Sequence, residues 1–372
     1  MKQQGSDIRI IISGGGTGGH VFPAIAIADA LKARLERLEL LFVGADNRLE
    51  MEKVPEAGYR IRGLPIRGFI RKITLKNISV IIRLFKSLRI ARKIIQEFQP
   101  DAVVGVGGYA SGPVLRIASR SGIPTLIQEQ NSYAGMTNKL LSSRVNKICV
   151  AYSGMERYFP GEKIILTGNP VRKEIQQADL GKRKEESIDY FSLDSEKKVI
   201  LVLGGSLGAR SINNSIMSKL DLLIQAEIQL LWQCGKTYYT NLEKFLESAG
   251  SRNIRLLGFI KKMDLAYAAA DLIISRAGAL TVSELCHVGK PVILVPSPNV
   301  AEDHQTRNAM ALAEKEAAVC IADHEVEDRM ISEAMSILKD PERSRLLSER
   351  IAALAARDSA MHIADEIIKM LE

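Results

Sequence analysis

The amino-acid sequence predicts an α/β protein with two doubly wound units, each built on a parallel β-sheet. A glycine loop that joins a β-branched strand to a helix occurs once in each half of the chain, and a second strand–turn–helix unit follows it in the same order both times. With 372 residues, 46% of them hydrophobic, the chain is long enough to build two cores. We expect ligands at the carboxyl ends of the strands, in a cleft where the two units face each other.

The first glycine loop follows the apolar run Ile10–Ile12 and has five glycines between Gly14 and Gly19. A helical pattern continues from Ala24. Glycines allow backbone N–H groups to approach a ligand closely, and a helix N-terminus adds partial positive charge there. The loop therefore predicts a site for anionic oxygens, with His20 as a titratable side chain beside it.

The same loop also fits a dinucleotide-binding fingerprint. Gly14, Gly16 and Gly19 have the required spacing, and Asp46 follows the next expected strand. Taken alone, this match is weak, and a tight turn without a ligand fits it as well. The context is more informative, because a second loop with a similar arrangement occurs at residues 204–210, after the apolar run 199–203.

The other repeated unit begins at Asp101 in the first half and at Asp271 in the second half. In each case an apolar strand leads into a glycine-containing turn and a helix. A Gly-x-Pro turn and another apolar strand follow, at 122–127 and at 289–294. The same order in both halves predicts two parallel-sheet domains.

Seven motifs, taken together, make the chain resemble the MurG family of bacterial glycosyltransferases. In order they are GGGTGGHVFPA (14–24), GVGGYASGP (105–113), EQN (129–131), GNPVR (168–172), GGSLGAR (204–210), RAGALTVSE (276–284) and DHQTRNA (303–309). The resemblance extends from about Ile8 to the C-terminus. It implies the two-domain GT-B fold and an inverting, metal-independent transfer of N-acetylglucosamine from its UDP donor onto lipid I, which gives lipid II for peptidoglycan. One departure is Gln128, where the family has histidine.

We place the domain boundary near residues 167–170, because glycine and proline interrupt the pattern there. Residues 1–169 are expected to form an N-terminal domain that faces the acceptor and the membrane, and residues 170–356 a C-terminal domain that binds the donor. The polar stretch 179–198 is expected to be exposed. The amphipathic segment at about 357–372 is expected to cross back to the N-terminal domain, as it does in GT-B enzymes.

The resemblance places the UDP-sugar on the C-terminal domain. The implied contacts are Ser206, Ile260, Ala279, Leu280, Thr281, Val282, Ser283, Glu284 and Gln305. Gln305 and Asn308, spaced i and i+3, can present their amides on one helix face toward the sugar hydroxyls, and Arg172 supplies a cation. Glu284 can accept both ribose hydroxyls, although a first-turn helix acid favoured by the dipole explains it equally simply. Helix N-termini and the cation of Arg172 can stabilise the diphosphate without a metal ion, and no other cofactor is implied.

His20 is the candidate general base, since the positive end of a helix dipole disfavours its charged form. A histidine that caps the loop or binds phosphate is the alternative. Glu129 is a rival base or an orienting group. Further substrate contacts are expected at Thr17, Gly18, Gly19, Tyr109 and Asn131. The other histidines are left as structural residues.

Charge is unevenly distributed along the chain, whose net charge is +8. Eleven basic residues and no acidic one lie between Ala57 and Gln96. Nucleic acid is a poor explanation because stacking aromatic motifs are missing, and a solvated face is the plain alternative. We expect this segment to bind the anionic inner leaflet through one helix face. Its membrane contacts would be Ile78, Ile82, Phe85, Lys86 and Arg89.

The remaining features favour a peripheral protein on the cytoplasmic face of the inner membrane. The four cysteines lack metal-ligand spacing, so we expect reduced thiols. We expect no signal peptide and no spanning helix, because no apolar run approaches 18 residues. The expected partners are UDP-N-acetylglucosamine, lipid I and the membrane surface, with no nucleic acid; cell-wall synthesis and division proteins are further candidates.

Other functions stay open from the sequence. A second enzyme on the same fold, such as a UDP-N-acetylglucosamine 2-epimerase or a diacylglycerol glycosyltransferase, shares many of these features. An epimerase needs no membrane surface, and the basic block therefore disfavours it. An NAD-dependent oxidoreductase or a non-catalytic nucleotide-sugar binder is disfavoured by the glycine loops in both halves and by His20.

Overall fold

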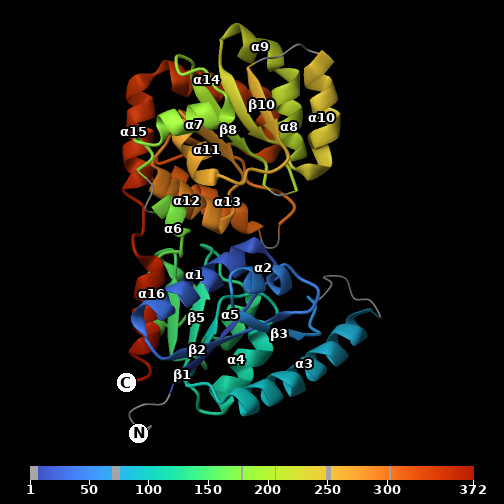
Figure 1. Cartoon of the computed structure of the whole chain (residues 1–372), viewed down its shortest axis with the longest axis vertical. Coiled ribbons are helices and arrows are strands. Elements are labelled where there is room, and N and C mark those ends of the chain that lie inside the picture. Colours follow the sequence, from blue (N-terminus) through green and yellow to red (C-terminus); the bar gives the residue numbers. More distant parts are fainter. Residues whose placement is uncertain (1–6, 69–75, 177–178, 206, 249–252, 301–302) are drawn as a thin grey trace. The chain divides into compact units, whose positions relative to one another are not determined.

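The computed structural model describes residues 7–68, 76–176, 179–205, 207–248, 253–300 and 303–372, without the side chains of 76–78 and 173. The chain packs as two compact units, shown in Figure 1. Unit 1 comprises residues 1–171 and 357–372, and unit 2 comprises residues 172–356. Both units have parallel sheets with helices packed on them, which confirms the predicted fold class.

Unit 1 has a seven-stranded parallel sheet in the order β3-β2-β1-β4-β5-β6-β7. The strands are β1 (Ile8–Ser13), β2 (Leu38–Ala45), β3 (Arg60–Leu64), β4 (Ala102–Gly105), β5 (Thr125–Glu129), β6 (Lys147–Val150) and β7 (Ile164–Leu166). The principal helices are α1 (Gly18–Arg34), α2 (Glu50–Glu56), α3 (Lys76–Phe98), α4 (Ser111–Arg120), α5 (Met136–Leu141) and α16 (Ser359–Ile368). The strand order reverses between β1 and β4, so the loops that follow these two strands meet at the switch point.

Two apolar layers cover the two faces of this sheet. On one face Ile11, Val103 and Ile127 pack with residues of α3 and α4. On the other face Ile10 and Ile12 pack with residues of α1 and α16. The last helix, red in Figure 1, therefore belongs to the core of unit 1 although it follows unit 2 in the sequence.

Unit 2 has a six-stranded parallel sheet in the order β10-β9-β8-β11-β12-β13. The strands are β8 (Val199–Leu203), β9 (Gln229–Gln233), β10 (Ile254–Leu257), β11 (Leu272–Ser275), β12 (Val292–Leu294) and β13 (Val319–Cys320). The helices are α6 (Lys173–Gln176), α7 (Lys184–Phe191), α8 (Arg210–Ser218), α9 (Leu220–Gln225), α10 (Lys236–Ser248), α11 (Met263–Ala269), α12 (Ala279–Val288), α13 (His304–Ala313), α14 (Val326–Lys339) and α15 (Pro341–Ala352). Here the switch point lies between β8 and β11.

One sequence expectation about an element was wrong. Helix α1 starts at Gly18 rather than Ala24, so Thr17 is its N-cap and His20 lies in its first turn. The stretch 179–198 is mostly exposed, as expected, but it contains helix α7, which packs against α11 and buries Phe191. Among the described helices, none combines the length and hydropathy that are needed to cross a bilayer.

Candidate functional site

The two glycine loops of unit 1 interlock at its switch point. Gly107 and Gly108 follow β4 and have φ values of +90° and +80°, which only glycine adopts readily. A Cβ on Gly108 would overlap the carbonyl oxygen of Gly15. The loop after β1 and the loop after β4 are therefore in backbone contact, and neither tolerates a side chain at this point.

His20 lies over the second of these loops. Its ring is half-buried, and its Nδ1 lies 3.2 Å from the hydroxyl oxygen of Thr17. A Cβ on Gly107 would lie 2.8 Å from Nε2 of His20 and 2.6 Å from its Cδ2. The imidazole is thus held between the N-cap of its own helix and the backbone of the loop after β4.

The close approach of His20 and Gly107 predicts a stability effect. Gly107→Ala should lower the free energy of unfolding by about 1–3 kcal/mol more than Gly122→Ala does. Both glycines have positive φ, but the Cβ position of Gly122 has open space around it. Urea unfolding of the two variants measures the difference. If both variants lost the same free energy of unfolding, the ring of His20 would move aside without an energetic cost.

Glu129 lies in a fully enclosed position at the end of β5. Its carboxylate accepts hydrogen bonds from the backbone N–H of Asn131 at 3.1 Å, the backbone N–H of Gly135 at 2.9 Å and Nδ2 of Asn138 at 2.8 Å. Burial raises the pKa of Glu129, and these donors oppose the rise. The carboxylate therefore holds the turn that carries Asn131, which suits an orienting group better than a base.

The neighbouring positions form a buried amide network. Gln128 donates from Nε2 to Oδ1 of Asn169 at 2.9 Å and accepts from Gln130. Gln130 also donates to the carbonyl of Val106 at 2.7 Å. Gln128 thus helps to fix the loop after β4. Tyr109, on the same loop, is 56% exposed and accessible to a ligand.

In unit 2 the predicted ribose-binding carboxylate is already engaged. Arg172 donates from Nε to Oε1 of Glu284 at 2.8 Å and from a terminal nitrogen to Oε2 at 3.1 Å. The hydroxyl of Tyr267 donates to Oε2 at 3.1 Å. Burial, and then the charge of Glu284, raises the pKa of Tyr267 well above its ordinary value, so this hydroxyl stays a donor.

The structure places the other predicted donor contacts unevenly. The side chains of Ile260, Ala279 and Val282 are buried, so a ligand can reach these residues only through their backbone. Asn308 is completely buried, and its Nδ2 donates to the carbonyl of Ala277 at 3.2 Å. The expectation that Asn308 presents its amide to a sugar hydroxyl therefore does not fit this conformation.

The remaining predicted residues lie in the first turns of α12, in the first turn of α1 or outside the described part. Leu280, Thr281 and Ser283 are half-buried in the first turns of α12, and the Ser283 hydroxyl donates to the carbonyl of Ala279 at 3.1 Å. Ser206 lies outside the described residues. Gly18 and Gly19 form the first turn of α1, whose N–H groups have no intrahelical acceptor.

A pocket of about 720 Å³ lies at the carboxyl ends of β8, β11 and β12. It is lined by the second glycine loop at Gly204 and Gly205, by Arg276 and by Gln305. Arg276 is fixed by Asp323 at 2.5 Å and by the carbonyl of Val295 at 3.2 Å. A fixed cation, a glycine loop and an amide at a switch point suit a phosphate-bearing ligand.

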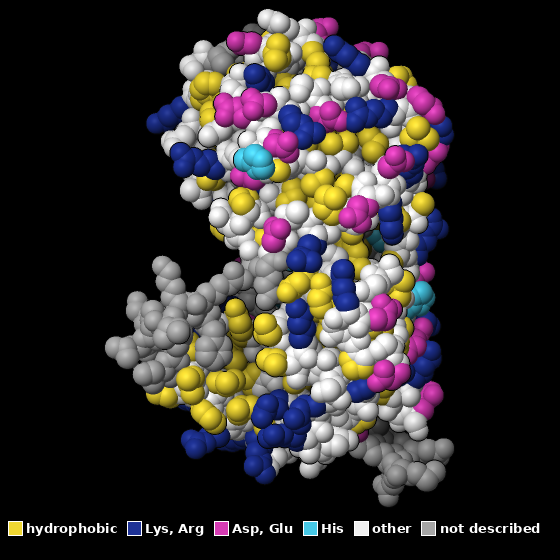
Figure 2. All heavy atoms as spheres, turned by 180° about the vertical axis from the view of Figure 1, so that it is seen from behind, with side chains coloured by type: hydrophobic (Ala, Val, Ile, Leu, Met, Phe, Trp, Pro, Cys, Tyr) yellow, Lys and Arg dark blue, Asp and Glu magenta, His cyan; other side chains and the backbone are white. Residues whose placement is uncertain are grey.

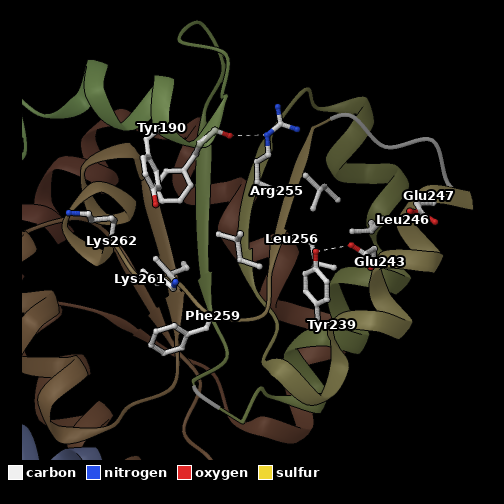
Figure 3. Close-up of a pocket in the computed structure, with 14 residues that line it drawn as sticks. Tyr190, Tyr239, Glu243, Leu246, Glu247, Arg255, Leu256, Phe259, Lys261 and Lys262 are labelled. Atoms are coloured by element: carbon white, nitrogen blue, oxygen red, sulfur yellow. Dashed lines mark hydrogen bonds between the residues drawn. The ribbon is translucent and has the colours of Figure 1, made fainter. Parts of the chain in front are cut away.

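A second hollow, of about 780 Å³, lies over edge strand β10 between α7 and α10, as Figure 3 shows. Tyr190, Tyr239 and Phe259 project into it from three different elements. Of the predicted donor contacts it contains only Ile260. Within the described residues, no three His, Cys, Asp or Glu side chains gather as metal ligands.

Helix α3 exposes the expected apolar and basic side chains. Ile82 and Phe85 are 63% and 61% exposed, and Lys86 and Arg89 are also exposed. Figure 2 shows hydrophobic and basic side chains mixed over the end of unit 1 that this helix covers. The side chain of Ile78 lies outside the described residues.

Sequence reasoning missed the partners of the predicted residues. Tyr267 is 17 positions from Glu284 and sits in an apolar helix, so nothing in the sequence pointed to it. Arg276 did carry a signal, because it begins the motif that contains Glu284.

Comparisons with known proteins agree with this geometry. Residues 10–150 match the glycosyltransferase family 28 N-terminal domain, and residues 199–366 match its C-terminal domain. A protein of Parabacteroides distasonis called UDP-N-acetylglucosamine–N-acetylmuramyl-(pentapeptide) pyrophosphoryl-undecaprenol N-acetylglucosamine transferase is 57% identical, with 98% of each chain covered. A Bacteroides fragilis protein of the same name is 53% identical, with 99% of this chain and 97% of that chain covered.

Two solved structures are similar to this chain over almost its whole length. MurG of Acinetobacter baumannii is similar with a TM-score of 0.79 and 29% identity, covering 97% of this chain and 99% of that one. A UDP-GlcNAc 2-epimerase of Neisseria meningitidis has a TM-score of 0.68 at 13% identity, covering 98% of this chain and all of that one, and this likeness shows the fold alone.

Proposed function

Because this chain belongs to glycosyltransferase family 28, we propose that it transfers N-acetylglucosamine from UDP-N-acetylglucosamine to lipid I, giving lipid II for peptidoglycan. The observation that carries the proposal is a sequence identity of 52–57%, over almost the whole chain, to relatives that are named as N-acetylglucosamine transferases of this kind. The buried Glu284 carboxylate in the second turn of α12 supports it, since a carboxylate can accept hydrogen bonds from both hydroxyls of a ribose.

Unit 2 is proposed to bind the donor. The ribose hydroxyls donate to Glu284, and Arg172 moves part of its guanidinium from this carboxylate to the diphosphate. The N-terminus of α12 and the fixed cation of Arg276 stabilise the negative charge that grows on the leaving phosphate oxygens. No metal ion is needed for this task.

Unit 1 is proposed to bind and activate the acceptor. His20 takes the proton from the attacking acceptor hydroxyl, whose oxygen forms the new bond to the anomeric carbon. The bond from that carbon to the β-phosphate oxygen breaks, UDP leaves, and the configuration inverts. Thr17, at 3.2 Å from Nδ1, orients the ring, and Tyr109, Asn131 and the first-turn N–H groups contact the acceptor.

A coupled assay with two substrates tests this function. Release of UDP from UDP-N-acetylglucosamine should require a lipid I analogue, and the analogue should gain one N-acetylhexosamine by mass spectrometry. UDP release at the same rate without acceptor would contradict the transfer. Conversion of the donor to its 2-epimer, with no acceptor present, would indicate the epimerase alternative instead.

We further propose that the enzyme is peripheral on the inner membrane and that it docks through α3. Ile82 and Phe85 are exposed beside Lys86 and Arg89. Between residues 79 and 96 this helix has no aspartate or glutamate. Apolar side chains among cations suit an anionic interface. Docking there would bring the enzyme to an acceptor whose diphosphate lies at the same surface. An association with cell-wall synthesis and division proteins stays a prediction.

The docking proposal predicts a selective defect. Ile82→Ser with Phe85→Ser should weaken binding to anionic vesicles by about tenfold or more, because two large apolar side chains no longer enter the interface. Activity on membrane-embedded acceptor should fall, while activity on a short-chain soluble analogue stays unchanged. Vesicle co-sedimentation measures the binding, and high salt should weaken the electrostatic part.

A matched control replaces exposed apolar side chains of unit 2. Tyr190 and Leu222 are 54% and 52% exposed, and Tyr190→Ser with Leu222→Ser should leave vesicle binding as it is. Equal vesicle binding by the α3 variant and the unchanged protein would rule out α3 as the docking helix.

A further inference from the structure

Glu50 is a buried carboxylate beneath the first glycine loop. It is the first residue of α2, and it is 1% exposed. Its Oε2 accepts a hydrogen bond from the backbone N–H of Gly16 at 2.7 Å, and its Oε1 accepts one from the backbone N–H of Ala45 at 2.9 Å. A single side chain therefore joins the loop after β1 to the end of β2.

Two glycines make room for this carboxylate. A Cβ on Gly15, whose φ is +143°, would overlap the carboxyl group of Glu50. A Cβ on Gly44 would overlap its Cγ. The backbone thus approaches the side chain from the loop after β1 and from β2, which explains these two glycines by packing rather than by ligand contact.

The bond to Glu50 changes what the glycine loop offers to a ligand. The N–H of Gly14 donates to the carbonyl of Val43 at 3.2 Å, and the N–H of Gly16 donates to Glu50. These two bonds tie the loop to β2 and to α2, so neither N–H group is directed at a ligand. The first turn of α1, at Gly18 and Gly19, keeps N–H groups without an intrahelical acceptor.

The tied segment leads directly into the candidate base. Thr17 follows Gly16, caps α1 and lies 3.2 Å from His20 through its hydroxyl. On the other side of the loop, Gly15 is in contact with Gly108, and the ring of His20 lies over Gly107. The position of the imidazole therefore depends on the conformation that Glu50 gives to residues 14–17.

We propose that Glu50 is a positioning residue of the transfer reaction, which acts through the glycine loop on His20 and does not touch either substrate. This inference rests on the proposed function. It names a charged group whose loss should affect turnover while donor binding by unit 2 continues.

The test is a double-mutant cycle between Glu50 and His20. In Glu50→Gln, one carboxylate oxygen becomes an NH₂ group that faces an N–H donor, so one of the two bonds is lost. This variant should lower kcat by about 10- to 100-fold, the cost of a small misplacement of a reacting group, and should leave the KM for UDP-N-acetylglucosamine within about twofold. In a His20→Ala background, the same change should cost less than about twofold, because residues that act as a unit are not additive.

Two further measurements separate positioning from general loss of structure. Glu56→Gln is the matched control, since Glu56 is an exposed carboxylate on the same helix, and it should change nothing. The imidazole NMR signal of His20, recorded without substrate, should move in Glu50→Gln and stay in Glu56→Gln. Because this measurement needs no substrate, its result does not depend on whether the proposed transfer reaction is correct.

The proposal is overturned if Glu50→Gln turns over normally, or if it costs as much in the His20→Ala background as in the unchanged protein. Glu50→Asp, which is too short to reach both N–H groups, serves as the second variant and should show the same pattern. Failure of both variants to fold would also overturn the proposal, since Glu50 would then support the whole of unit 1.

Discussion

His20→Ala should lower kcat by about 10²–10⁴-fold, the range expected for loss of a general base. The affinity for UDP should stay within about twofold, because the donor contacts proposed in unit 2 are untouched. The structure supports this division, since His20 is held by Thr17 and by the backbone of Gly107, all in unit 1. Steady-state kinetics and calorimetry with UDP measure the two quantities.

His362→Ala is a suitable control, because His362 is exposed on α16 in the same unit. It should leave both kcat and UDP affinity as they are. Normal turnover in His20→Ala would exclude His20 as the base and leave Glu129 as the candidate base. A loss of UDP affinity as large as the loss of turnover would instead indicate that His20 binds phosphate.

Glu284→Ala should weaken UDP and UDP-N-acetylglucosamine alike, by about 1.5–3 kcal/mol for a pair of charge-assisted hydrogen bonds. Both ligands carry the ribose, so the effect should not depend on the sugar. The carboxylate is buried and holds Arg172 and Tyr267. Its removal therefore also leaves a guanidinium and a hydroxyl without their partner. Calorimetry with the two ligands measures the loss.

Two variants separate the loss of ribose binding from the loss of a partner for Arg172 and Tyr267. Glu284→Gln keeps the size of the side chain and one acceptor oxygen, and it should bind UDP with an intermediate affinity. Glu342→Ala removes an exposed carboxylate of α15 in the same unit and should have no effect. If Glu284→Ala bound UDP normally, Glu284 would be only the structural partner of Arg172 and Tyr267; it lies in the second turn of α12, so the sequence-based alternative of a first-turn acid does not fit the structure.

The fold could be predicted because its signals are local and repeated. Each sheet has a glycine turn directly after a buried strand, and these turns occur in the same order in both halves. The start of α1 could not be predicted in the same way. Its first two turns contain Gly18, Gly19 and Pro23, which have low helix propensity, and the contacts that the loop makes with Gly108 and Glu50 are not visible in the sequence.

The candidate site was predictable where a residue carries its own motif, and not where it depends on a distant partner. Glu284 and His20 belong to motifs that the sequence displays. Tyr267 bonds to Glu284 from another helix, and Glu50 bonds to the glycine loop that precedes His20, so these contacts are visible only in the three-dimensional packing. Asn308 shows the opposite error, because its polar side chain turns inward to a backbone carbonyl.

The return of the chain to unit 1 has a consequence for biosynthesis. Ile363 and Ile367 of α16 are fully buried against the sheet of unit 1, yet they are synthesised after the whole of unit 2. Unit 2, by contrast, is one continuous segment. All of unit 2 is therefore synthesised before unit 1 receives its closing helix, and until then unit 1 has part of its apolar surface uncovered. A chain that stops before α16 would contain the whole of unit 2 and lack the closing helix of unit 1.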